Sequence, residues 1–340
     1  MLDNYSYKEE IKNANEKGLL GNLENVYLNS ENDDDYLEFD GVFRYFKFAL
    51  ENSISYKLTP NVVYFSKKGI LNARATKSNG YFIMEIAKGL IEGLIYFFLL
   101  KKNLDKQIKI QGFIIFLENT GIKLNSFLYE VAILYSFYHE EAHLIQKSEL
   151  GFSAAEINNS NEWSIEEKHN LELDADEFAG INLSRHVVQK FLSIEKKNQN
   201  KDVFEKILIT CSTSILLYRL KVDPNKEMYF LEKKEISHPH TVNRVITILF
   251  GLINYSTKVV IGNQSINYKI DAIKLIKDSL SIANDLAPTI ADDFQLIDKF
   301  IADIENNGRD IFTYIKLLEN KRRLNSTLAV SKFNSLAKKV

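Results

Sequence analysis

The sequence has little cysteine and little proline, and it carries almost no net charge. One cysteine, Cys211, occurs in 340 residues, which excludes an intramolecular disulfide framework and favours a reducing, cytoplasmic location. Only four prolines and 14 glycines are present, so we expect long helices rather than a turn-rich β fold. The formal net charge of −2 gives no overall field that would attract nucleic acid or an acidic membrane.

The sequence also lacks an uninterrupted apolar run long enough to cross a membrane. The most apolar segment, residues 81–100, contains Glu85, Lys88 and Glu92 at helical spacing, which predicts an amphipathic helix on a protein core. The first 15 residues are polar and carry both signs of charge, so we expect no secretory signal there. These features predict a soluble cytoplasmic protein without a membrane span, and no pattern indicates its oligomeric state.

Hydrophobic patterning predicts an α+β fold that is mainly α-helical. Short extended segments are expected at residues 61–65, 70–76 and 81–83, which would form a small N-terminal β-sheet. Helices are expected at residues 7–17, 41–53, 85–101, 125–147, 164–195, 202–220, 241–252, 270–287, 291–305 and 311–321, and residues 102–126 as a connection. We divide the chain into an N-terminal region (1–60), a central domain (61–255) and a helical C-terminal region (256–340).

One short pattern inside an apolar helix carries chemistry. Residues 139–143 read His-Glu-Glu-Ala-His, which is an H-E-x-x-H pattern. Positions i and i+4 of a helix lie on one face, about 6 Å apart. His139 and His143 can therefore bind one zinc ion, and Glu140 then lies beside the metal, where a general base is needed.

A catalytic zinc site usually has three protein ligands and one position for water. The longer pattern H-E-x-x-H-x-x-G-x-x-H is absent, because Gln146 and Glu149 stand where glycine and histidine would be required. Residues 172–176 instead read E-x-x-A-D, which offers Glu172 as the third ligand. Asp176, one turn later, can accept a hydrogen bond from the far nitrogen of a liganding histidine.

Three alternatives to this site stay open at the level of the sequence. His169, one turn before Glu172, is another candidate for the third ligand. A second alternative is a structural zinc site, although such sites usually add cysteine or histidine and Cys211 is the only thiol. The third is that the two histidines are hydrogen-bonded core residues with no metal.

These patterns resemble those of the glutamate-type zincins, and of the HtpX-like peptidases in particular, which pair H-E-x-x-H with a downstream E-x-x-A-D. Two more motifs of that family occur here in the family's order. An Asn-Ala-x-Ala strand at residues 72–75 is followed by Gly-Leu at 89–90, and His-Pro-x-x-x-x-Arg occurs at 238–244. Together the four motifs extend over about residues 61–250, so the resemblance implies a zincin-like core in the central domain.

The resemblance also implies roles for individual residues. The strand that contains Asn72, Ala73 and Ala75 would bind an extended protein or peptide substrate through the hydrogen bonds of a sheet edge. His238 would stabilise the oxyanion or orient the substrate. Arg244 would belong to the substrate-binding residues, where it would hold nearby backbone or a carboxylate.

The sequence therefore predicts a zinc-dependent metalloendopeptidase with one Zn²⁺ held by His139, His143 and Glu172. Glu140 would take a proton from the metal-activated water and pass it to the leaving amine. HtpX-like enzymes are usually embedded in membranes, whereas this chain is expected to have no membrane span. In that respect it is similar to the phage-exclusion peptidases of the Lit type. This likeness implies a role in phage defence or a stress response. The alternative function is a non-catalytic zinc-binding or degenerate peptidase-fold protein that acts as a binding module.

Overall fold

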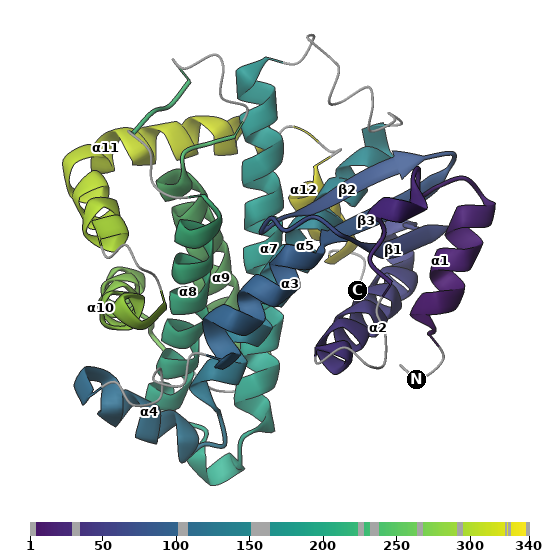
Figure 1. Ribbon diagram of the computed structural model, residues 1–340. Coiled ribbons are helices and arrows are strands. Elements are labelled where there is room, and N and C mark those ends of the chain that lie inside the picture. The colour runs from purple at the N-terminus through teal and green to yellow at the C-terminus, as the bar shows by residue number, and fades with distance from the viewer. Residues whose placement is uncertain are drawn as a thin grey trace.

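The protein is built mainly of long helices with one small sheet near the N-terminus, as the computed structural model in Figure 1 shows. The structure describes residues 5–28, 35–100, 108–150, 164–223, 228–231, 238–263, 268–290, 295–323, 325 and 328–337. The expected mainly helical α+β class is confirmed. The acidic residues 31–34 and the loop at 151–163 lie outside the described residues. No helix in the described part of the chain combines the length and apolar composition that crossing a membrane requires.

Two helices that precede the strands in the chain pack against strand β1. They are α1 (Tyr7–Glu16) and α2 (Tyr36–Asn52), with short 3-10 turns at Leu23–Asn25 and Ile54–Tyr56. Ser6 begins α1 because its side chain accepts a hydrogen bond from the Glu9 N–H. Both helices bury aromatic side chains against Phe65 of strand β1, with the rings of Tyr7 on α1 and Phe39 on α2 centred 5.2 and 5.0 Å from it.

The sheet has three strands in the order β1-β3-β2. Strand β3 (Tyr81–Ala87) lies in the middle, parallel to β1 (Asn61–Ser66) and antiparallel to β2 (Ala73–Ser78). Asn79 and Gly80 join β2 to β3 with φ angles of 48° and 78°, the two positive values that a type I′ hairpin turn requires. Within the described residues β2 pairs with β3 alone, which leaves its other edge free of strand partners.

Strand β3 is longer than the sequence predicts, and the helix after it starts later. The expected helix at 85–101 is wrong in its first turn, because Glu85 lies on β3 and is paired with Arg74 of β2 and Tyr64 of β1. Pairing on both sides extends the strand through Ala87 despite the helical spacing of the charges. Helix α3 (Lys88–Leu94) follows and continues as a π-helical segment, Ile95–Leu100.

Four long helices form the centre of the molecule, and one of them, α5, packs against strand β2. They are α5 (Leu124–Leu150), α7 (Ile165–Ser193), α8 (Lys201–Val222) and α9 (Thr241–Asn263), with a 3-10 turn at Lys196–Asn198. A capping box at Ser164 and Glu167 begins α7. The expected connection at 102–126 contains a 3-10 turn at Ile108–Ile110 and the helix α4 (Gln111–Glu118), whose apolar residues favour burial over an extended link.

The C-terminal third is helical as expected, but its helix boundaries differ from the prediction. The helices are α10 (Ala272–Ile290), α11 (Gln295–Arg323) and α12 (Ala329–Ala337). Pro288 lies inside α10 and does not begin a helix. Helix α11 continues through Asn307 and Gly308, because packing on α7 and α9 outweighs a glycine penalty of about 1 kcal/mol. The proposed boundary at residue 255 falls within α9.

Helices α7 and α9 approach each other closely where Gly180 meets the backbone of α9. A Cβ atom at Gly180 would lie only 2.4 Å from the carbonyl oxygen of Ile248. On the facing helix, a Cβ at Gly251 would lie 3.1 Å from the carbonyl oxygen of Glu177. This close approach fixes the position of α9 relative to α7, and both helices carry residues of the site described below.

This contact predicts that Gly180→Ala destabilises the protein. Alanine favours a helix over glycine by about 0.5–1 kcal/mol, but relieving the clash with backbone costs about 1–3 kcal/mol. Gly308→Ala is the matched control, because that helical glycine has no atom within 4 Å of its added Cβ. Urea unfolding should show a lower stability for Gly180→Ala and an equal or higher one for Gly308→Ala. Equal stability of the two variants would contradict the close packing.

Candidate metal centre

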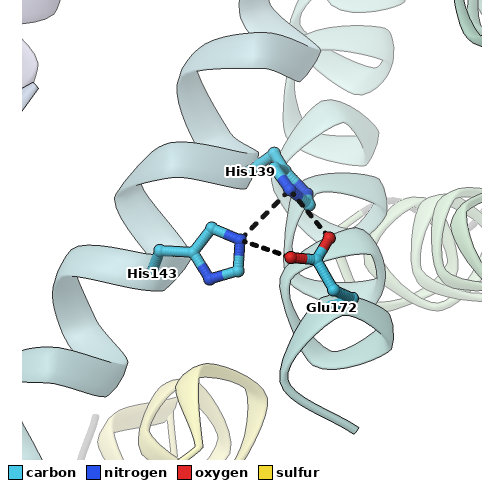
Figure 2. A group of neighbouring side chains, drawn as sticks. All are labelled: His139, His143 and Glu172. Carbon is cyan, nitrogen blue, oxygen red and sulfur yellow. Dashed lines mark hydrogen bonds and ion pairs between the residues drawn. The ribbon is translucent and has the colours of Figure 1, made fainter. Parts of the chain in front are cut away.

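Three metal-ligating side chains from two helices converge at one point (Figure 2). His139 and His143 project from α5, and Glu172 projects from the neighbouring helix α7. The two Nε2 atoms lie 3.2 Å apart. His143 Nε2 lies 3.5 Å from Glu172 Oε1, and His139 Nε2 lies 3.6 Å from Glu172 Oε2. The three residues predicted as metal ligands are therefore brought together and could hold a metal ion.

The separations between these donor atoms suit a tetrahedral ion. Bonds of about 2.0–2.1 Å at tetrahedral angles place two ligand atoms about 3.3 Å apart. The two imidazole nitrogens, 3.2 Å apart, match that value, and each lies 3.5–3.6 Å from a different oxygen of Glu172. With one ligand atom taken from each residue, all separations stay within 4.8 Å. Two imidazole nitrogens and one carboxylate also leave a fourth position without a protein ligand among the described residues.

The electrostatic surroundings keep these donors in the forms that bind metal. Burial lowers the pKa of His143 to about 3, so the ring is neutral at neutral pH. Burial by itself would raise the pKa of Glu172, but the charges of Arg244 and His238 hold that pKa well below its usual range. A neutral imidazole and an ionised carboxylate both offer a lone pair to a cation.

Asp176 lies beneath His139 and is completely buried. Its Oδ1 lies 3.0 Å from His139 Nδ1, as the sequence predicts, although the ring nitrogen is off line for a regular hydrogen bond. The same carboxylate accepts hydrogen bonds from Tyr135 Oη at 2.6 Å and from Arg244 Nε at 2.7 Å. Burial would raise the pKa of Asp176, but Arg244 and His139 hold it well below its usual range.

Arg244 lies deeper than its predicted place beside the substrate. Only 5% of it is exposed, and its Nη2 lies 3.0 Å from Asp176 Oδ1 and 3.1 Å from Glu172 Oε2. It therefore holds two carboxylates of the site from below. Tyr135 was not predicted as a site residue. Its position one helical turn before His139 is the feature of the sequence that could have indicated it.

Glu140 faces the edge of the sheet next to the metal ligands. Burial raises the pKa of Glu140, and the backbone N–H of Ala75 interacts with its carboxylate. The Lys147 ammonium donates a hydrogen bond to the carbonyl oxygen of Ala75. Both backbone groups of Ala75 thus point away from β3 and toward α5.

The predicted substrate residues are placed differently along this edge. Ala73 and Ala75 lie on β2, two residues apart, so their backbone groups face the same edge. Asn72 precedes the strand, and its carbonyl oxygen accepts a hydrogen bond from the Ala87 N–H of β3. The backbone carbonyl of Asn72 is therefore directed into the sheet rather than toward the free edge.

His238 lies on the solvent side of the cluster. Its Nδ1 is 3.3 Å from Glu172 Oε1, and 58% of its side chain is exposed, compared with 11–16% for the three ligands. The negative charge of Glu172 raises the pKa of His238. Its backbone carbonyl accepts a hydrogen bond from Tyr229 Oη at 3.0 Å. Solvent thus reaches the cluster on the His238 side.

Two alternative ligands lie elsewhere. His169 is completely buried, and its Nδ1 lies 2.5 Å from Tyr314 Oη on α11 rather than in the donor group. Cys211 is buried within α8 and does not belong to the group either. The donor set that the structure assembles is therefore His139, His143 and Glu172.

The second glutamate of the H-E-x-x-H pattern faces away from the metal ligands. Glu141 is buried against α2, with its Oε1 2.6 Å from Ser53 Oγ. Burial raises the pKa of Glu141 to about 7. The two adjacent glutamates therefore occupy different environments, and Glu140 is the one beside the donor group.

The raised pKa of Glu141 predicts how stability depends on pH. In an unfolded chain the pKa of a glutamate is about 4.3. The stability that neutral Glu141 contributes is therefore present below pH ~4.3 and is lost as pH rises through about 7. Thermal unfolding of the metal-free protein should show that Glu141→Gln leaves the melting temperature unchanged near pH 4.5 and raises it at pH 8. An equal change at both pH values would contradict a raised pKa.

Comparisons with protein-family models, with curated proteins and with solved structures found no match to this chain. The resemblance to HtpX-like peptidases accordingly stays a prediction that rests on the four motifs. The geometry of the donor group stands independently of that resemblance.

Proposed function

We propose that this protein is a zinc-dependent metalloendopeptidase with an HtpX-like, glutamate-type zincin site. The single observation that carries the proposal is the placement of Glu140 between the donor group and the free edge of a strand. A structural metal site needs neither a buried carboxylate beside the ligands nor a strand edge facing them. A peptidase needs both, since it must move a proton and hold an extended chain.

The donor set supports zinc as the metal. His139, His143 and Glu172 give the two-histidine, one-glutamate set that is typical of catalytic zinc in peptidases. When bound there, zinc polarises a carbonyl group and lowers the pKa of a water molecule to about 7. One ion fills the space between these three side chains.

Glu140 acts as the general base and then as the general acid. A carboxylate with a raised pKa accepts a proton from the attacking water more readily than an ordinary glutamate does. The proton then passes from Glu140 to the nitrogen of the leaving amine, so the carboxylate is regenerated in each cycle.

The remaining site residues have two kinds of role. His238 is exposed beside Glu172, and a donor there stabilises the oxyanion, a type of contact worth about 3–4 kcal/mol of barrier. Asp176 and Arg244 hold His139 and Glu172 in place. Arg244 is thus a positioning residue rather than a substrate-binding one.

An extended peptide binds along strand β2. The outward backbone groups of Ala75, and those of Ala73 two residues before it, offer the hydrogen bonds of an antiparallel strand pair. In this structure the side chains of Glu140 and Lys147 interact with the Ala75 groups. The substrate backbone replaces both of these contacts, which frees Glu140 to face the scissile bond.

Two narrower points belong to the same proposal. A cytoplasmic location fits the single buried cysteine, Cys211. A role in phage exclusion, as in the Lit-type peptidases, or in a stress response rests on the H-E-x-x-H pattern and on the lack of a spanning helix among the described residues. The alternative is a degenerate peptidase fold that binds zinc or a partner without catalysis, and the retained Glu140 argues against it.

Glu140→Gln should lower cleavage of an unstructured, fluorescently labelled protein by about 10²–10⁴-fold, because the general base is lost. Zinc content measured by metal analysis should stay at one ion per chain. Glu141→Gln is the matched control, since it makes the same change at the adjacent residue that faces Ser53, and it should cleave like the unchanged protein.

A chelator should abolish the cleavage, and added zinc should restore it. Cleavage by Glu140→Gln at the rate of the unchanged protein would overturn the role of Glu140. Zinc binding without any cleavage by the unchanged protein, tested against unstructured proteins, would favour the non-catalytic alternative.

A further inference from the structure

The far nitrogen of His143 contacts a buried glutamine on its own helix. His143 Nδ1 lies 2.9 Å from Oε1 of Gln146, of which only 2% is exposed. The ring nitrogen that is not bonded to Gln146, Nε2, is the one that faces His139 and Glu172. Whether Nδ1 donates a hydrogen bond to Gln146 or accepts one from it therefore decides whether Nε2 carries a proton or a free lone pair.

Two acceptors fix the orientation of the Gln146 amide. Its Nε2 donates hydrogen bonds to the carbonyl oxygen of Leu171 at 3.0 Å and to Asp174 Oδ2 at 2.8 Å. A carbonyl and a carboxylate can only accept, so the NH₂ group must face them. The amide oxygen of Gln146 then faces His143. Because that oxygen can only accept, Nδ1 of His143 must carry the proton of this hydrogen bond. This tautomer leaves the lone pair on Nε2.

Asp174 is in turn held by the first turn of helix α12. It is completely buried, and its carboxylate accepts hydrogen bonds from the backbone N–H of Ala329 at 2.7 Å and of Val330 at 3.2 Å. The N-terminus of a helix has unpaired N–H groups and favours a negative charge. A continuous chain of hydrogen bonds thus runs from α12 through Asp174 and Gln146 to His143.

We propose that Gln146 and Asp174 are positioning residues that hold His143 in its metal-binding tautomer, with the N-terminus of α12 as their anchor. The inference rests on the metal site of the proposed function, but it does not depend on peptide hydrolysis. It assigns a role to Gln146, three residues after the H-E-x-x-H pattern, and to Asp174 inside the E-x-x-A-D pattern. It also gives the C-terminal helix α12 an effect on the metal site.

The chemistry of Asp174 explains why a carboxylate is needed there. The N–H groups of α12 and the NH₂ group of Gln146 are all donors, and two carboxylate oxygens can serve every one of them. Asp174→Ala removes both oxygens. The N–H groups of α12 then lose their acceptor, and Gln146 keeps only the carbonyl of Leu171 to orient its amide, so the tautomer of His143 is held less firmly.

The first test measures zinc affinity of the full-length chain by competition with a chelator. Gln146→Met keeps the side-chain length and removes the acceptor, and it should bind zinc about 10–100-fold more weakly. Asp174→Ala should also weaken zinc binding, but by less than Gln146→Met, because the carbonyl of Leu171 still orients the Gln146 amide. Thr210→Val is the control, because it removes one buried hydrogen bond on α8, to the carbonyl of Lys206, without touching this chain of contacts. Zinc affinity of Gln146→Met equal to that of the unchanged protein would overturn the proposal.

The second test reads the tautomer directly and needs neither zinc nor activity. Long-range ¹H–¹⁵N spectra of the metal-free, unsubstituted protein should show the His143 proton on Nδ1, with the signal assigned by His143→Gln. In Gln146→Met, which offers no acceptor to Nδ1, the proton should no longer be confined to Nδ1. A His143 proton on Nε2 in the unsubstituted protein would overturn the proposal, even if the variants fail to fold. Zinc binding and tautomer as stated but no peptidase activity would overturn the proposed function alone.

Discussion

The rest of the site depends on the contacts that the buried guanidinium group of Arg244 makes with two carboxylates. Asp176 is completely buried and the side chain of Glu172 is 14% exposed, so each carboxylate would be costly to keep ionised there alone. Arg244 contacts both, and removing one partner of such a buried group typically costs about 3–5 kcal/mol. Because Arg244 is on α9, the site depends on the close packing of α9 on α7 at Gly180.

Much of the donor group could be predicted from spacing along single helices. An i, i+4 pair places His139 and His143 on one face, and the same spacing places Glu172 and Asp176 together on α7. No local pattern specifies which helices pack together. The order of the motifs was therefore the only basis for predicting that these two faces meet. The structure brings the two pairs together, which is the part of the prediction that depended on the resemblance.

The predictions that were wrong or incomplete concern contacts between distant segments. Arg244 was expected at the substrate and instead lies beneath the ligands, because its partners come from α7. Gln146 was noted only as a mismatch to another zinc pattern, although its contacts join α5, α7 and α12 into one hydrogen-bonded chain. The length of β3 and the continuity of α11 were missed for the same reason, since pairing and packing outweighed local propensity there.

The central claim is that one metal ion is held by three side chains with a fourth position open toward His238. Anomalous X-ray diffraction at the zinc absorption edge, from crystals grown with zinc, tests this claim most directly. We predict one peak about 2.0–2.2 Å from His139 Nε2, His143 Nε2 and a Glu172 oxygen, with no fourth protein ligand. A peak elsewhere, or a fourth side chain that completes the coordination, would contradict a catalytic site at this position.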